Sequence, residues 1–224
     1  MNVAVLFTGG KDSTYSLYLA MKIHNVKYLV TISSRNPESF MFHTPNIKLT
    51  KLQAKLIRIP IIFRETMGIK EQEVKDLKNA LKKLNIDCVV SGAIASNYQK
   101  TRVDRICKEL KLKHIAPLWH KDPAEILNNM VNQKFEIIIT SVAAPPMNES
   151  WLGRTIDKDC VNDLIKLNKE FGINISGEGG EYETLVLDCP LFSKKISIIE
   201  SKKYWDRKTQ SGELRVRKVE LIDR

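Results

Sequence analysis

The chain has 224 residues, 43% of them hydrophobic, and a formal net charge of +10 at pH 7. A chain of this length and composition is an ordinary globular protein that can bury one good core, or a main domain with a smaller appendage. No apolar run approaches the roughly 18 residues of a membrane span, and no signal-peptide pattern opens the chain, so we expect a cytoplasmic protein without a membrane partner.

The positive charge is concentrated in residues 1–120, which hold 20 Lys and Arg against 9 Asp and Glu. Residues 121–224 hold 16 against 17. This asymmetry favours a polyanionic ligand, either a nucleotide triphosphate or a nucleic acid backbone, in the first half. A lysine-rich helical surface of a heat-adapted protein is the alternative explanation.

Short β-branched runs alternate with amphipathic stretches through the first half. Strands are predicted at residues 3–7, 28–33, 61–66, 87–92 and 113–118. Helices are predicted at residues 13–24, 70–84 and 96–110. The alternation predicts right-handed β-α-β crossovers and a parallel sheet, which binds ligands at the carboxyl ends of its strands.

The pattern changes after Trp119. Helices are predicted at residues 123–132 and 158–172, and strands at residues 135–144 and 213–222. We therefore predict an N-terminal α/β domain with a parallel sheet over residues 1–120. A smaller C-terminal α+β domain is predicted over residues 121–224.

The four cysteines are widely spaced and form no C-x-x-C pair, which argues against a zinc knuckle or a redox dithiol. They are Cys88, Cys107, Cys160 and Cys189. Buried free thiols in a reducing compartment are the better interpretation.

The stretch TGGKDS, residues 8–13, follows the first apolar strand. Glycines there allow a tight turn that points backbone N–H groups and a helix N-terminus at an anion. Lys11, which we expect to be open to solvent, adds a cation. A Walker A loop is excluded, because Val5 stands where its first glycine should be and Asp12 follows the lysine. A strand-to-helix turn capped by Asp12 or Ser13 is the purely structural alternative.

TGGKDS resembles the SGGKDS signature of the PP-loop ATP pyrophosphatases, with Thr8 in place of the usual serine. The resemblance implies a PP-loop (adenine nucleotide alpha hydrolase-like) fold and an enzyme that cleaves ATP to AMP and pyrophosphate. It also implies that Asp12 helps to hold Mg²⁺. The ATP-binding residues that it implies are Thr8, Gly9, Gly10, Lys11, Asp12 and Ser13, with Ser33 and Ser34 near the adenine.

A second motif, GEGGEYETLVLDCP, covers residues 177–190. Glu178, Glu181 and Glu183 lie within six residues, and such a cluster is costly unless a cation compensates it. A solvated acidic turn is the alternative.

The string EGGEYET resembles the signature of the diphthine-ammonia ligases. The resemblance continues, in the family's order, through MFHTPN, TMGIKEQEV, SGAIASNYQKTRV, PLW and WLGRTID. It implies amidation of diphthine, a modified histidine of translation elongation factor 2, with ATP and ammonium. The implied route is an acyl-adenylate, and the implied products are diphthamide, AMP and pyrophosphate.

Roles follow from the resemblance residue by residue. Lys11, Asp12, Glu178, Glu181 and Glu183 are the expected catalytic residues. The glutamates, with Tyr182, could recognise the trimethylammonium group of diphthine or bind ammonium and take its proton, and the sequence leaves both roles open. Further ATP contacts are expected from Gly92, Gln99 and Arg102, and further substrate contacts from His43 and Asn46.

Two alternatives stay open. One is a PP-loop ligase that modifies tRNA, which the basic first half would suit, although no C-x-x-C pair or catalytic cysteine pair is present. The other is a non-catalytic ATP-binding module. No glutaminase residues are evident, so ammonium is the expected nitrogen source. We expect no nucleic acid partner, and a homo-oligomer is compatible with the sequence.

Overall fold

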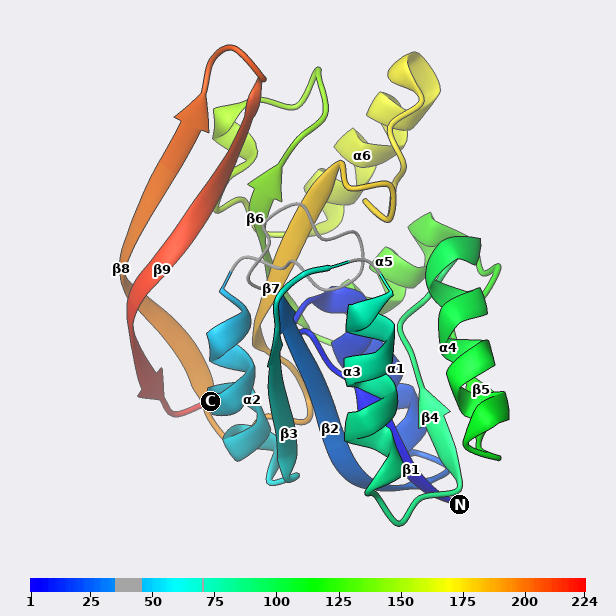
Figure 1. Ribbon diagram of the computed structural model, residues 1–224. Coiled ribbons are helices and arrows are strands. Elements are labelled where there is room, and N and C mark those ends of the chain that lie inside the picture. The colour runs from blue at the N-terminus through cyan, green and yellow to red at the C-terminus, as the bar shows by residue number, and fades with distance from the viewer. Residues whose placement is uncertain (35–45, 70) are drawn as a thin grey trace. The chain divides into compact units, whose positions relative to one another are not determined.

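The computed structural model describes residues 1–34, 46–69 and 71–224 (Figure 1). The chain divides into two compact units, Met1–Trp119 and His120–Arg224. We call them the N-terminal unit and the C-terminal unit.

A five-stranded parallel sheet forms the centre of the N-terminal unit, with strand order β3-β2-β1-β4-β5. The expected parallel sheet is thus confirmed. The strands are β1 (Asn2–Leu6), β2 (Asn25–Ser34), β3 (Ile61–Thr66), β4 (Cys88–Val90) and β5 (Lys113–Ile115). β1 and β4 are almost wholly apolar because helices bury both faces of the sheet.

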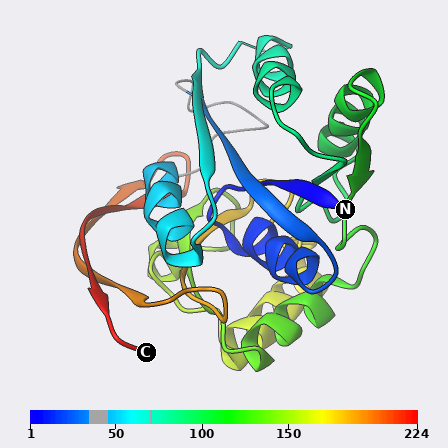
Figure 2. The same cartoon turned by 90° about the horizontal axis from the view of Figure 1, so that it is seen from below.

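Helices lie on both faces of this sheet, as Figure 2 shows. α3 (Gln72–Lys82) and α4 (Asn97–Glu109) cover one face, and α1 (Lys11–Met21) and α2 (Thr50–Ile57) cover the other. A 3-10 turn, Ile47–Leu49, leads into α2. The sequence did not predict α2, because it is short and ends at Arg58 (φ 63°) without the glycine that usually marks a helix end.

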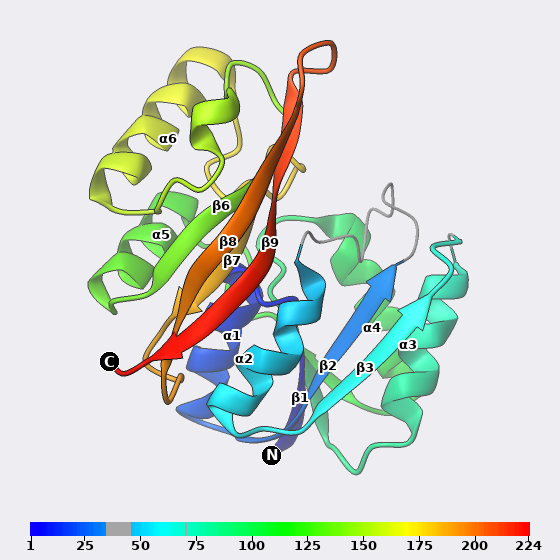
Figure 3. The ribbon, with the colours of Figure 1, turned by 90° about the vertical axis from the view of Figure 1, so that its left-hand side faces the viewer.

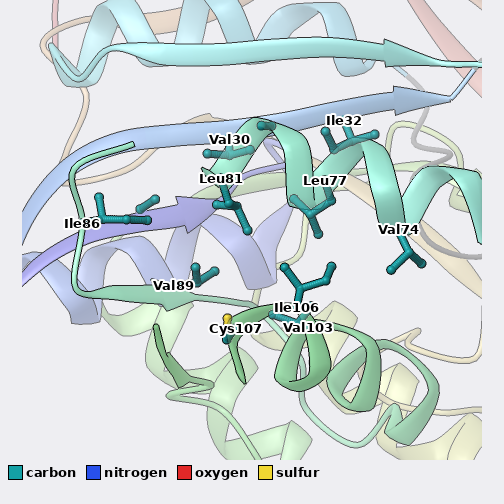
Figure 4. Packing of buried hydrophobic residues seen from close by; sticks show 12 residues of the cluster. Val30, Ile32, Val74, Leu77, Leu81, Ile86, Val89, Val103, Ile106 and Cys107 are labelled. Atoms are coloured by element: carbon teal, nitrogen blue, oxygen red, sulfur yellow. The ribbon is translucent and has the colours of Figure 1, made fainter. Parts of the chain in front are cut away.

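The core of the N-terminal unit between the sheet and α3 and α4 is shown in Figure 4. Val74, Leu77 and Leu81 repeat at helical spacing along α3 and point toward the sheet. Burying each such side chain stabilises the fold by about 1.5–3 kcal/mol. Their partners are Val30, Ile32, Val89, Val103 and Ile106.

The C-terminal unit contains a four-stranded antiparallel sheet of order β7-β6-β9-β8 with α5 (Pro123–Asn132) and α6 (Lys158–Phe171). Its strands are β6 (Glu136–Val142), β7 (Tyr182–Asp188), β8 (Lys195–Asp206) and β9 (Ser211–Ile222). Figure 3 shows β8 and β9 as a long ribbon. A 3-10 turn, Glu149–Trp151, follows β6. This unit has the α+β composition that the sequence predicts.

All four cysteines are buried free thiols, as expected. Burial raises the pKa of Cys107 and of Cys189 to about 12, so neither is a nucleophile at neutral pH. Among the described helices, none combines the length and the apolar composition that crossing a bilayer requires.

Candidate active site

The loops after β1 and β4 meet where the connectivity of the parallel sheet changes direction. β1 and β4 are neighbours, with Val5 paired to Val90, but the chain leaves β1 toward β2 and leaves β4 toward β5. At such a point the two connections diverge and leave a crevice at the carboxyl ends of the strands. Residues 8–13, which we call the 8–13 loop, lie at the end of β1.

The 8–13 loop leads directly into α1 through two glycines. Gly9 has a φ of +77°, and Gly10 is the N-cap of α1, with no side-chain cap from the described residues; the Ser13 and Thr14 hydroxyls donate to the Gly10 carbonyl instead. A helix start of this kind leaves backbone N–H groups available to an anion. Thr8 and Ser13 close the loop, because the Ser13 hydroxyl lies 3.2 Å from the Thr8 nitrogen and 3.1 Å from the Thr8 hydroxyl.

Lys11 is not open to solvent as the sequence suggested. Only 3% of the residue is exposed, and its Nζ lies 2.7 Å from Oδ2 of Asp12. Because Lys11 is the first residue of α1, its stem packs in the loop while its charge pairs with the neighbouring carboxylate. The loop therefore holds an ion pair at the helix N-terminus in which the lysine is buried and the aspartate is partly exposed.

Two residues outside the loop fix its backbone. Gln53, fully buried in α2, donates from Nε2 to the Gly9 carbonyl at 3.0 Å. A Cβ on Gly9 would lie 2.2 Å from Gln53 Oε1, so the loop requires glycine there for space as well as for φ. A Cβ on Gly92 would lie 2.9 Å from the Asp12 carbonyl carbon and from the Ser13 nitrogen. Gly92 thus packs against the loop, and its contact with ATP stays a prediction.

A partly buried series of hydrogen bonds runs from the end of β4 to α4. His114 Nε2 lies 2.8 Å from Ser91 Oγ, and its Nδ1 lies 2.6 Å from Asp104 Oδ1. Asp104 Oδ2 accepts from Lys100 Nζ at 2.7 Å. These hydrogen bonds could not be predicted from the sequence, because Ser91 and His114 are 23 residues apart and meet only through the pairing of β4 with β5.

Burial lowers the pKa of His114, and this effect outweighs the Asp104 carboxylate, which raises it. The imidazole is therefore neutral at neutral pH. A carboxylate only accepts, so Nδ1 carries the proton and Nε2 accepts from the Ser91 hydroxyl. Burial raises the pKa of Asp104, but hydrogen bonds from Lys100 and His114 outweigh burial and lower it overall.

Arg102, a predicted ATP contact, is held on the surface of α4. Its guanidinium lies 3.5 Å from the centre of the Tyr98 ring, and Nη2 donates to Glu71 Oε1 at 3.1 Å. Arg105 donates to the other Glu71 oxygen at 2.9 Å. These bonds lower the pKa of Glu71. The hydrogen bond from Arg105 has the largest effect, and the one from Arg102 adds to it.

The other predicted contacts of the N-terminal unit lie on separate elements. Ser33 and Ser34 end β2 and are half-buried. Gln99 lies in the first turn of α4, where its backbone nitrogen donates to Ser96 Oγ. Asn46 caps a 3-10 turn at a φ of 65°. His43 lies outside the described residues.

The acidic motif forms a closed turn in the C-terminal unit, residues 174–183, which we call the acidic turn. Asn174 Oδ1 accepts from the nitrogen and the hydroxyl of Ser176 at 2.9 and 2.8 Å. Glu181 Oε1 accepts from the Asn174 nitrogen at 3.3 Å, while Glu181 Oε2 is buried without a hydrogen-bond partner. A Cβ on Gly179 would lie 2.7 Å from Glu181 Oε1, so glycine lets this carboxylate fold against the turn.

Tyr182 holds the acidic turn from the other side. It is 2% exposed, and its hydroxyl donates to the Ile175 carbonyl at 2.6 Å. Gly177, with a φ of +68°, lies against the tyrosine ring and leaves little of that ring for a ligand. Glu183 follows in β7 opposite Ser141 of β6, and both Glu178 and Glu183 are half-buried.

In the described parts of the chain, no three His, Cys, Asp or Glu side chains come together as a metal site. Asp12 is the carboxylate within the 8–13 loop. Mg²⁺ commonly takes one or two carboxylates together with substrate phosphates, so a site completed by a nucleotide fits this single carboxylate.

Two family models match nearly the whole chain. A model described as the diphthamide synthase N-terminal domain matches residues 1–114, and one described as the diphthamide synthase C-terminal domain matches residues 122–222. The chain belongs to the diphthamide synthase family. The resemblance in the sequence is therefore confirmed.

Curated relatives in the family are named diphthine–ammonia ligase, so the expectation of a ligase is confirmed at the level of the family. The Homo sapiens protein is 34% identical over 90% of this chain and 84% of its own length. The Rattus norvegicus protein is 35% identical over 88% of this chain and 83% of its own length. The Schizosaccharomyces pombe protein is 35% identical over 89% of this chain, which spans 36% of that longer protein.

A solved structure of a predicted subunit of tRNA methyltransferase from Methanocaldococcus jannaschii covers 85% of this chain and 98% of its own. It has a TM-score of 0.48 and 17% sequence identity, a likeness too slight to support a function.

Proposed function

We propose that this protein is a cytoplasmic, ATP-dependent diphthine–ammonia ligase that amidates the diphthine of translation elongation factor 2 with ammonium. The observation that carries the proposal is the start of α1 at the point where the sheet changes direction. There α1 begins with Lys11 directly after two glycines and without a side-chain cap, which suits the phosphates of ATP. Membership of the diphthamide synthase family supports the choice of substrate.

The first proposed step activates the carboxylate of diphthine. A carboxylate oxygen attacks the α-phosphorus of ATP, and pyrophosphate leaves as the acyl-adenylate forms. The N–H groups at the start of α1 and the ammonium of Lys11 would stabilise the charge that develops on pyrophosphate. Lys11 would then exchange its bond to Asp12 for a phosphate oxygen.

Mg²⁺, when bound, would neutralise phosphate charge. Asp12 is the residue that would hold it. Gln53 and Gly92 would keep the Asp12 backbone in place, because both pack against the 8–13 loop.

The second proposed step forms the amide. Ammonia attacks the acyl carbon, AMP leaves with one of the carboxylate oxygens, and the nitrogen loses its extra proton. Ammonium must itself be deprotonated before it attacks. Glu178, Glu181 or Glu183 would bind it and take this proton, or would pair with the trimethylammonium group of diphthine, which cannot donate hydrogen bonds.

Incubation with diphthine-bearing elongation factor 2, ATP, magnesium and ammonium tests the proposal. Intact mass should show conversion of the acid to the amide, with one AMP released for each amide. Glutamine freed of ammonium should not replace ammonium. No conversion, or efficient conversion with glutamine alone, would contradict it.

A further inference from the structure

A basic groove lies along the outer strand of the N-terminal sheet, away from the 8–13 loop in the sequence. It has a volume of about 610 Å³ and is lined by part of α2, the turn after it and β3. We call it the α2–β3 groove. Its charged lining residues are Lys51, Lys55, Arg58 and Arg64, and none of the described residues that line it is acidic. A cavity of this volume is in the usual range for a binding site.

The four cations of the groove form no ion pair with any residue in the described ranges, and all are exposed. The helices on the opposite face of the same sheet differ. There several basic side chains form ion pairs. The pairs are Lys78 with Glu109, Lys100 with Asp104, and both Arg102 and Arg105 with Glu71. Several basic side chains on that face are thus paired with carboxylates, whereas none of the four cations of the α2–β3 groove is paired within the described part of the chain. Uncompensated charge of this kind attracts an anionic partner.

The groove follows the edge of a strand and not one face of it. Residues 59–64, six in a row, line it. Because successive side chains of a strand point to opposite faces, consecutive residues share one cavity only along the strand's edge. β3 is the outermost strand of its sheet. The backbone groups of such an edge can pair with an added extended segment.

The lining favours a peptide over a nucleic acid. Between the cations lie Pro60, Ile61 and Ile62, an aliphatic surface that suits apolar side chains. The aromatic ring of the groove, Phe63, carries the Lys51 ammonium 4.2 Å from its centre, so that face is not available for stacking a base.

We propose that the α2–β3 groove binds an acidic, partly apolar segment of the protein substrate, in extended conformation along the edge of β3. The proposal rests on the function proposed above, which requires a protein substrate. Carboxylates of the segment would pair with the groove's cations, and its intervening apolar side chains would cover the aliphatic surface.

The direct test is fluorescence anisotropy with a labelled peptide in which glutamate alternates with leucine. A peptide of alternating lysine and leucine is its counterpart. The protein should bind the acidic peptide, with affinity falling as salt rises, and should not bind the basic one. The double variant Lys51→Glu/Lys55→Glu should lose at least about tenfold in affinity, and Lys51→Gln/Lys55→Gln should lose less.

The matched control is Lys82→Glu/Lys83→Glu, which makes the same charge change at the exposed end of α3 and should leave the affinity unchanged. Absence of binding to the acidic peptide, or equal losses in the control, would overturn the proposal. So would tighter binding of a labelled single-stranded RNA through the same lysines, because the groove would then be a nucleic acid site.

Ligation assays separate this proposal from the function on which it rests. Lys51→Glu/Lys55→Glu should raise the KM for elongation factor 2 at least about tenfold and leave the KM for ATP unchanged. If the variant ligates with an unchanged KM for elongation factor 2, the groove proposal is wrong and the proposed ligase function stands. If the protein binds the acidic peptide but forms no amide, the proposed ligase function is wrong and the groove is still a peptide site.

Discussion

The 8–13 loop and the acidic turn are built alike but differ in charge, because the loop pairs its Lys11 with Asp12 while the turn carries glutamates without a cation of its own. Each has a glycine at positive φ packed against a neighbouring side chain, Gly9 on Gln53 and Gly177 on Tyr182. Each also uses an amide side chain as a brace, Gln53 for the first and Asn174 for the second. The first turn begins a helix with a lysine, and the second carries three glutamates within six residues of the sequence. Similar bracing holds both backbones, so we expect the difference in charged residues to decide which turn receives an anion and which a cation.

The largest expected effect comes from removing the cation of the 8–13 loop. Lys11→Ala should lower the rate of ATP-dependent AMP release at least about a hundredfold, because a charge that stabilises the leaving group is lost. It should also lower the free energy of unfolding by about 1–3 kcal/mol, because Asp12 loses a buried partner. Lys11→Arg, which keeps the charge, is the control. Normal AMP release by Lys11→Ala would remove the loop from the reaction.

Neutralising the glutamates of the acidic turn should lower the rate of amide formation and leave ATP binding nearly unchanged. Replacing Glu178, Glu181 or Glu183 singly by glutamine keeps side-chain size. At least one of these variants should abolish amide formation, while ATP binding measured by calorimetry changes by less than about 1 kcal/mol.

Two results would break the division between the turns. Full ligase activity in all three glutamine variants would make the acidic turn purely structural. Loss of ATP affinity would assign its carboxylates to the metal and nucleotide.

A single methyl group at Gly92 tests the packing behind the 8–13 loop. Gly92→Ala should raise the KM for ATP at least about tenfold, because its Cβ would lie 2.9 Å from the Asp12 backbone and would displace the loop. Thermal unfolding is the control that separates this displacement from global destabilisation. An unchanged KM for ATP would mean that the packing of Gly92 against the 8–13 loop does not matter for ATP binding.

The smallest expected effect is the pH dependence of His114. Its folded pKa is lowered, so its contribution to stability is present above the unfolded value of 6.5 and is lost as pH falls below it. Protonated His114 can no longer accept from Ser91, a change on the order of 1 kcal/mol. Asp104, which bonds both His114 and Lys100, has a lowered pKa and stays ionised in this range.

Urea unfolding of the wild type and of His114→Gln at pH 7.5 and 5.5 measures this contribution. The wild type should lose more stability than the variant on acidification. Equal losses would mean that the imidazole already titrates normally.

The sequence predicts local structure well where side chains follow a strict period. The apolar spacing of α3 and the Asp122–Pro123 start of α5 place those helices. α2 was missed because Arg58 ends it in a conformation that the sequence does not signal.

Contacts between distant residues could not be predicted. The bond from Gln53 to Gly9 spans 44 residues and depends on how α2 packs. The burial of Lys11 likewise depends on surroundings that spacing does not encode.

The central claim is that the carboxylate of diphthine is activated by attack on the α-phosphorus of ATP. Substrate factor whose diphthine carboxylate is labelled with heavy oxygen measures this directly, with AMP, pyrophosphate and the amide analysed by mass spectrometry. We predict that one heavy oxygen appears in AMP for each amide formed and that pyrophosphate stays unlabelled. Amide formation with the label in inorganic phosphate, or with unlabelled AMP, would contradict the account.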